Sequence, residues 1–277
     1  MDDRPDAGAR RRRDAGRWAV NLDDAGVVIT GGGGGIGGAL ARRFAAAGAR
    51  VVVADLDAEA VERVAREVGG VAVVGDAASE DGVSRLIERA KAELGEIELF
   101  CANAGVAPHG GPEAPEDAWA RAWEINVMAH VRAAKLLLPD WLERGRGRFL
   151  ATVSAAGLLT MLGSAPYSVT KHGALAFAEW LSATYRHRGI TVQAVCPQGV
   201  RTNMLAGTGS GGQLLMAGSA IDPSDVADEV MKGLADGRFL ILPHPEVREY
   251  YETRATSTDR WLGGMNKLQQ KIEALPK

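Results

Sequence analysis

Gly26-Val27-Val28-Ile29-Thr30-Gly31-Gly32-Gly33-Gly34-Gly35-Ile36-Gly37 is the stretch that decides the fold of this 277-residue chain. A β-branched run passes into five glycines and then into residues 36–48, which have the apolar spacing of an amphipathic helix. Such a strand, turn and helix bring backbone N–H groups to a helix N-terminus, where they can bind a pyrophosphate. The glycines fit several registers of G-x-G-x-x-G, so the run alone predicts a βα turn that can approach an anion.

The same alternation continues along the chain. Six further apolar runs predict strands at residues 51–53, 71–74, 99–101, 149–153, 191–195 and 239–242. Most of these runs are apolar throughout, as in parallel strands that are buried on both faces. Amphipathic patterns predict helices at 36–48, 58–68, 79–94, 116–143, 166–187 and 223–235. The sequence therefore predicts an α/β fold with a doubly wound, parallel, seven-stranded sheet, Rossmann-like, whose ligand crevice lies at the carboxyl ends of the strands.

This alternation predicts one sheet domain at 24–245 with an extension at each end. Residues 1–23 mix acids with a basic run at 10–13 that no apolar stretch follows, so we expect a flexible extension rather than a targeting signal. Residues 203–222 are rich in Gly and Ser and predict a mobile flap. Residues 246–277 predict a C-terminal helical extension, and its apolar stripe is expected to pack on the core or on a second subunit. The stripe consists of Trp261, Leu262, Met265 and Leu268.

The composition excludes several classes of protein. A net charge of −3 leaves no basic excess for a nucleic-acid partner. No run of about 18 apolar residues is present, so we expect no membrane span. Cys101 and Cys196 each close an apolar run and are interpreted as buried small residues of a cytoplasmic protein. The histidines lack metal-ligand spacing, so no metal site is expected, and His109 lies in a loop where it can face substrate or solvent.

An acid marks the end of the second predicted strand. Asp55 lies 20 residues beyond Gly35, where a carboxylate can accept hydrogen bonds from the adenosine ribose hydroxyls and would repel a 2′-phosphate. No basic residue lies in the glycine turn, and Arg50 precedes the strand. The expected cofactor is NAD rather than NADP.

The second half of the chain carries groups suited to proton transfer. Tyr167 and Lys171 lie four residues apart, one turn along the same helical face. A hydride that leaves a secondary alcohol requires removal of the hydroxyl proton, and tyrosine, with a pKa near ~10, is a poor base at neutral pH. A neighbouring lysine ammonium stabilises the phenolate and lowers the pKa of the tyrosine. Ser154 lies at the end of the fifth predicted strand, and Asn126 lies in the helix before it.

Together these features resemble the short-chain dehydrogenase/reductase family over about residues 24–245. The resemblance implies a catalytic tetrad of Asn126, Ser154, Tyr167 and Lys171. It implies that Ser154 hydrogen-bonds the substrate oxygen, that Asn126 holds a water linked to Lys171, and that Lys171 also binds the nicotinamide ribose. Tyr167 would likewise contact the cofactor. The other cofactor residues that the resemblance implies are Thr30, Gly31, Gly35, Ile36, Gly37, Asp55, Asp76, Ala77, Asn103, Gly105, Pro197, Val200 and Thr202.

The chain departs from the family's pattern in three places. Ala102 replaces the first asparagine of the usual Asn-Asn-Ala-Gly. Pro197-Gln198-Gly199 replaces the usual Pro-Gly, which puts the Gln198 side chain beside the nicotinamide and makes it a candidate substrate contact with Ser154 and Tyr167. Pro243-His244-Pro245 stands where many members have a glycine-rich turn.

The predicted function is hydride transfer between NAD(H) and a hydrophobic secondary alcohol or ketone, steroid-like or aromatic, because the expected pocket walls at 155–166 and 203–222 are largely apolar. One alternative is an NADP-dependent carbonyl or 3-oxoacyl-thioester reductase of the same family. Another is a catalytically idle dinucleotide-binding sensor or scaffold. The helices at 116–143 and 166–187 are the family's usual pairing surface, so we expect a homodimer or homotetramer.

Overall fold

The computed structural model describes residues 22–206 and 217–274. Almost all of the predicted N-terminal extension and the middle of the predicted flap, residues 207–216, lie outside the described residues.

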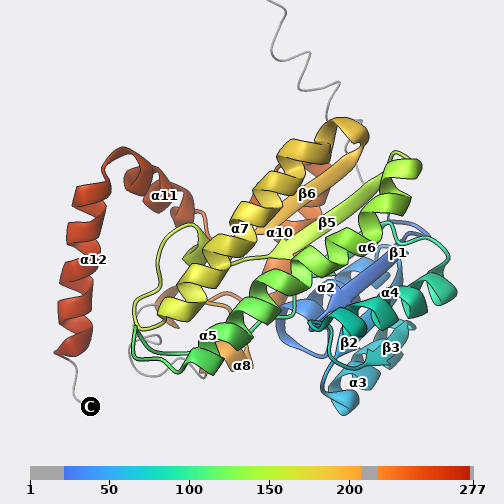
Figure 1. Ribbon diagram of the computed structural model, residues 1–277, viewed down its shortest axis with the longest axis horizontal. Coiled ribbons are helices and arrows are strands. Elements are labelled where there is room, and N and C mark those ends of the chain that lie inside the picture. Colours follow the sequence, from blue (N-terminus) through green and yellow to red (C-terminus); the bar gives the residue numbers. More distant parts are fainter. Residues whose placement is uncertain (1–21, 207–216, 275–277) are drawn as a thin grey trace, which may run out of the picture.

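Seven parallel strands form one sheet in the order β3-β2-β1-β4-β5-β6-β7 (Figure 1). The strands are β1 (Gly26–Thr30), β2 (Arg50–Asp55), β3 (Val71–Val74), β4 (Leu99–Ala102), β5 (Gly147–Thr152), β6 (Ile190–Val195) and β7 (Leu240–Ile241). The predicted doubly wound, seven-stranded parallel sheet is confirmed. The chain reverses its direction of winding between β1 and β4, and the carboxyl ends of these two strands open the crevice in which such folds bind ligands.

Helices cover both faces of the sheet, and each face has its own apolar core. The helices are α2 (Gly35–Ala45), α3 (Ala58–Val68), α4 (Glu80–Leu94), α5 (Glu116–Trp123), α6 (Ala129–Glu143), α7 (Ala165–Tyr185), α8 (Asn203–Ala206) and α10 (Pro223–Asp236). One core lies beneath α2, α3 and α10, and the other beneath α4, α6 and α7. In β1, Val27 and Ile29 face the first core while Val28 faces the second, which explains why this strand is apolar at every position.

The helix predicted at 116–143 is interrupted. A π-helical turn over Glu124–Met128 separates α5 from α6, and Asn126 lies in this turn. Such single π turns occur mostly at functional sites. A period of 3.6 residues does not reveal one wider turn, so the sequence pattern could not show it.

The C-terminal extension is helical, as predicted, but its apolar stripe does not pack on the core of this chain. Helix α11 (Glu246–Thr256) is anchored by the fully buried Val247, whereas α12 (Thr258–Glu273) has no buried residue and lies apart from the sheet (Figure 1). The Leu262 side chain is exposed. Among the described residues, none of the helices combines the length and the hydrophobicity that a membrane span requires.

Candidate active site

A cavity of about 750 Å³ opens at the carboxyl ends of the strands and brings together most of the predicted site. Thr30, Gly37 and Asn126 are buried behind its wall and do not line it. The predicted residues that line it are Gly31, Gly35, Ile36, Asp55, Asp76, Ala77, Asn103, Gly105, Ser154, Tyr167, Lys171, Pro197, Gln198, Val200 and Thr202.

The glycine turn that follows β1 forms one end of this cavity. Gly31 has a φ of 64°, which favours glycine, and a Cβ on Gly37 would collide with the carbonyl oxygen of Gly31. Thr30 fixes the turn from behind, because its Oγ1 accepts hydrogen bonds from the backbone N–H groups of Asn103 and Ala104, both at 3.0 Å. The Asn103 side chain donates in return to the carbonyl oxygens of Thr30 and Gly31, at 3.0 and 3.2 Å. The turns after β1 and β4 are therefore held together across the switch point.

Asp55 lies at the end of β2 beside the glycine turn. Its Oδ2 accepts from the Gly33 N–H at 2.9 Å, and its Oδ1 accepts from the Asp57 N–H at 3.2 Å. Each carboxylate oxygen keeps a lone pair that can accept a further hydrogen bond.

Arg63 is a neighbour of Asp55 that sequence reasoning missed. It lies on α3, lines the same cavity, and its Nη2 donates to the Gly33 carbonyl oxygen at 3.4 Å. No spacing in the sequence singles out Arg63, because its approach to the cavity depends on where α3 packs beside the glycine turn.

Ser154, Tyr167 and Lys171 meet at the other end of the cavity. Tyr167 and Lys171 project from α7 and are buried, and Ser154 follows β5. The Tyr167 hydroxyl is hydrogen-bonded to the Ser154 side chain. Ser154 Oγ accepts from the Ala156 N–H at 3.1 Å and lies 3.4 Å from the Pro197 carbonyl oxygen, to which it donates.

The electrostatics of the two α7 side chains follow from their burial. Burial raises the pKa of Tyr167, and its hydrogen bond with Ser154 opposes that rise. Burial also lowers the pKa of Lys171 to about 8. The Lys171 Nζ lies 5.7 Å from the centre of the Tyr167 ring and donates to the Thr152 carbonyl oxygen at 2.9 Å.

Asn126 has partners on both of its amide atoms. Its Oδ1 accepts from the Val106 N–H at 3.0 Å, while its Nδ2 donates to the Val106 carbonyl oxygen and to Thr170 Oγ1, at 2.9 and 3.0 Å. A methyl group placed on Gly105 would lie 3.1 Å from Asn126 Oδ1 and 3.4 Å from Lys171 Nζ. Gly105 therefore leaves open the space into which both groups point.

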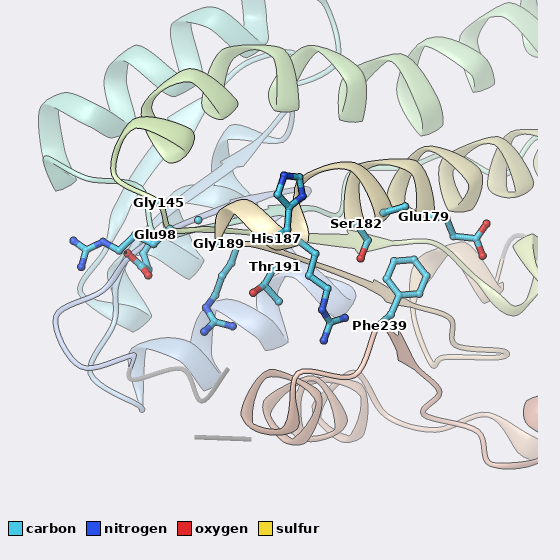
Figure 2. Close-up of a pocket in the computed structure, with 13 residues that line it drawn as sticks. Glu98, Gly145, Glu179, Ser182, His187, Gly189, Thr191 and Phe239 are labelled. Atoms are coloured by element: carbon cyan, nitrogen blue, oxygen red, sulfur yellow. Dashed lines mark ion pairs between the residues drawn. The ribbon is translucent and has the colours of Figure 1, made fainter. Parts of the chain in front are cut away.

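A second cavity, of about 830 Å³, lies at the amino ends of β4, β5 and β6 (Figure 2). Glu98, His187 and Phe239 are among its lining residues, and Glu98 forms an ion pair with Arg146. None of the predicted site residues lies there. Because doubly wound sheets bind ligands at their carboxyl edge, we assign the chemistry to the first cavity.

Cys101 and Cys196 are both buried, which confirms their interpretation as small core residues. Burial raises the pKa of Cys196 to about 12. His109 is exposed. Within residues 22–206 and 217–274, no cluster of three or more His, Cys, Asp or Glu is arranged to hold a metal ion.

Comparison with known proteins identifies relatives of this chain. The family model described as short chain dehydrogenase matches residues 25–211. The 1-deoxy-11-beta-hydroxypentalenate dehydrogenase of Streptomyces exfoliatus is 37% identical over 242 residues, which cover 83% of this chain and 86% of the relative. The cis-4-hydroxycyclohexanecarboxylate dehydrogenase of Sinomonas cyclohexanicum is 34% identical over 73% of this chain and 86% of its own length. A solved structure of a short chain dehydrogenase/reductase from Burkholderia phymatum in complex with NAD superposes with a TM-score of 0.81, at 26% identity, and covers 87% of this chain and 96% of that one.

Proposed function

Because this chain belongs to the short-chain dehydrogenase/reductase family, we propose that it transfers a hydride between NAD(H) and a hydrophobic secondary alcohol or its ketone. The observation that carries the proposal is the meeting of Ser154, Tyr167 and Lys171 in a cavity whose other end is a glycine turn at a helix N-terminus. When bound, the nicotinamide supplies the hydride acceptor or donor, and the chain's own residues orient the substrate and move its proton.

Tyr167 is the proposed proton-transfer residue. Its hydroxyl faces Ser154, so a substrate oxygen that replaces Tyr167 as the partner of Ser154 would lie within reach of both hydroxyls. Lys171 has a pKa of about 8, so most of it carries a positive charge near neutral pH, and that charge stabilises the Tyr167 phenolate. The Ser154 hydroxyl stabilises negative charge that develops on the substrate oxygen.

Asn126 is proposed to support this transfer from behind. Both amide atoms bind Val106, so the side chain fixes the segment after Gly105 and leaves one Oδ1 lone pair near Lys171. A water held by that lone pair would complete the route by which a proton returns to solvent.

Two features support NAD as the cofactor. Asp55 presents a carboxylate beside the glycine turn, where ribose hydroxyls can donate to it and a 2′-phosphate would be repelled. The solved relative from Burkholderia phymatum carries NAD. Arg63 favours the alternative, an NADP-dependent reductase, because its guanidinium lies on the same wall and can pair with a phosphate.

Turnover measurements test this assignment. We expect NADH absorbance to rise when the protein is mixed with NAD and a cyclic secondary alcohol, and a higher kcat/KM with NAD than with NADP. The panel includes cyclohexanol and cis-4-hydroxycyclohexanecarboxylate, since the two enzyme relatives named above carry the names of hydroxylated carboxylates. Replacing Tyr167 with Phe is expected to abolish turnover while NADH still binds. Retained turnover in that variant would overturn the mechanism.

We also propose that the chain assembles through α5 and α7. Trp123, Val169 and Trp180 are exposed, and Trp123 lies against the position of Gly173 between the other two on α7. A second subunit seated on α5 and α7 would cover these exposed apolar side chains. Light scattering coupled to gel filtration is expected to give the mass of a dimer or tetramer, and a lower mass for Trp180→Glu.

A further inference from the structure

His244, in the turn after β7, has a side chain that is only 2% exposed and has a partner on each ring nitrogen. The Gln198 N–H donates to His244 Nδ1 at 3.1 Å, and Nε2 lies 3.1 Å from the Ser219 carbonyl oxygen. A peptide N–H can only donate, so Nδ1 is the acceptor and the ring proton resides on Nε2, which donates to Ser219. One side chain thus joins the turn after β6, the segment before α10 and the turn after β7.

The peptide unit that His244 binds is the one that Ser154 binds from the other side. The carbonyl oxygen of Pro197 accepts from the Ala155 N–H at 2.8 Å and from Ser154 Oγ at 3.4 Å. The N–H of Gln198, in the same planar unit, points to His244. Because a peptide unit is rigid, the position of His244 sets the direction of the carbonyl that meets Ser154.

This contact also unites two departures from the family's usual sequence, the Pro197-Gln198-Gly199 segment and the Pro243-His244-Pro245 turn. The neighbouring backbone bonds do not reach the Gln198 N–H, since the Ala155 N–H holds only the carbonyl side of this peptide and Ile221 pairs with Gly199 and Arg201, further along the same turn. Within the described residues, the imidazole is the partner that the structure gives to the Gln198 N–H.

We propose that His244 is a positioning residue, which holds the Pro197–Gln198 peptide so that Ser154 is aimed at the substrate and the Gln198 side chain forms part of the pocket wall. The inference rests on the proposed function, since it assigns Ser154 to the substrate oxygen. His244 itself does not line the cavity, so it acts through Gln198 and Ser154.

Two variants separate its two hydrogen bonds. In His244→Asn the amide oxygen takes the place of Nδ1 and keeps the bond to Gln198, whereas in His244→Gln the amide nitrogen takes the place of Nε2 and keeps the bond to Ser219. Each variant loses one buried hydrogen bond, so similar drops in melting temperature are expected. The kcat for alcohol oxidation is expected to stay within about threefold of wild type in His244→Asn and to fall about tenfold or more in His244→Gln, because only the latter leaves the Gln198 N–H side of the peptide unheld.

Gln193 supplies a matched control. Its Nε2 donates to the carbonyl oxygens of Gly233 and Arg238, at 2.7 and 2.8 Å, and it is buried on β6 outside the cavity. Gln193→Leu should lower the melting temperature and leave kcat unchanged. Equal kcat values in the His244→Asn and His244→Gln variants, or a kcat that follows the melting temperature across all three variants, would overturn the proposal.

A binding measurement separates failure of this inference from failure of the proposed function. Fluorescence titration with NADH needs no turnover, and the affinity should fall in His244→Gln and stay near wild type in His244→Asn. ADP-ribose, which lacks the nicotinamide, should bind both variants as it binds wild type. If wild type oxidises no alcohol but this order of NADH affinities holds, the positioning role stands and the proposed reaction falls. Equal NADH affinities in the two variants would refute the positioning role.

Discussion

Replacing Lys171 with Met removes a buried charge and should change activity and stability in opposite directions. The Lys171 Nζ lies 5.7 Å from the centre of the Tyr167 ring. With the phenolate charge placed at the ring centre and an effective dielectric constant of about 20, an ammonium at this distance stabilises a phenolate by ~3 kcal/mol. Its loss raises the pKa of Tyr167 by about two, at ~1.4 kcal/mol for each pKa unit. We therefore expect kcat/KM at pH 7 to fall roughly 100-fold.

The same change should stabilise the fold at neutral pH. Burial lowers the pKa of Lys171 from 10.5 to about 8, so the charged side chain costs the folded state about 3 kcal/mol below pH 8. Between pH 8 and 10.5 the unfolded chain binds more protons than the folded one, so the stability contributed by this residue rises with pH across that window. Loss of the hydrogen bond from Lys171 to the Thr152 carbonyl oxygen reduces this gain in stability by ~1 kcal/mol. The expected net gain is about 2 kcal/mol at pH 7, falling toward zero by about pH 10.

Two assays check this prediction. Initial rates with NAD and the best alcohol of the panel, from pH 6 to 10, give the pH profile of kcat/KM, and urea unfolding at pH 7 and pH 10 gives the free energy of unfolding. Lys135→Met is the matched control, because Lys135 is exposed and pairs with the equally exposed Glu80. It should leave both measurements unchanged. A Lys171→Met variant that keeps its pH profile, or that is less stable than wild type at pH 7, would refute the reasoning.

Three further changes test other parts of the structure. Gly105→Ala would place a methyl group 3.1 Å from Asn126 Oδ1, so kcat should fall about tenfold. Gly264→Ala, in open space, is the control, and an unchanged kcat in Gly105→Ala contradicts the role of that space. Asp55→Asn removes the charge that would repel a 2′-phosphate, so the ratio of kcat/KM with NADP to kcat/KM with NAD should rise at least about tenfold. Adding Arg63→Ala should reverse this rise. An unchanged ratio in Asp55→Asn would show that Asp55 does not set the cofactor preference. Burial lowers the pKa of His130 to about 3, so the unfolded chain takes up a proton at this residue below about pH 6.5 that the folded chain does not, and the fold loses stability. The free energy of unfolding of His130→Leu, minus that of wild type, should therefore be about 2 kcal/mol larger at pH 5 than at pH 7.5. Equal differences at the two pH values would refute this.

Local signals explain what could be predicted from the sequence. The limits predicted for β3 and α3, 71–74 and 58–68, agree with the structure, because an apolar run and an amphipathic period each have clear ends. Gly69, with a φ of 62°, stops α3 at the predicted residue. Most of the cavity residues could also be predicted, because they follow directly after the end of a parallel strand.

Contacts between distant segments could not be predicted in this way. Arg63 faces the glycine turn because of where α3 packs beside that turn, and no spacing in the sequence encodes this placement. The stripe on α12 has the period of a packed helix, but a period cannot say which surface, if any, the helix meets. His244 reaches Gln198 across 46 residues, because β6 and β7 are neighbours whose ends lie at the same edge.

The location of the site follows from the winding of the sheet. β1 and β4 are adjacent, yet the helices after them cover opposite faces, so the turns that leave their carboxyl ends diverge and leave a crevice. The crevice must then be held at a fixed width, and Thr30 and Asn103 do this with reciprocal hydrogen bonds between the two turns. At the other end, Ser154 and His244 hold one peptide between them. Strand order therefore creates the cavity, whereas buried polar side chains set its dimensions. For that reason, substitutions of these buried side chains should change turnover more than they change the fold.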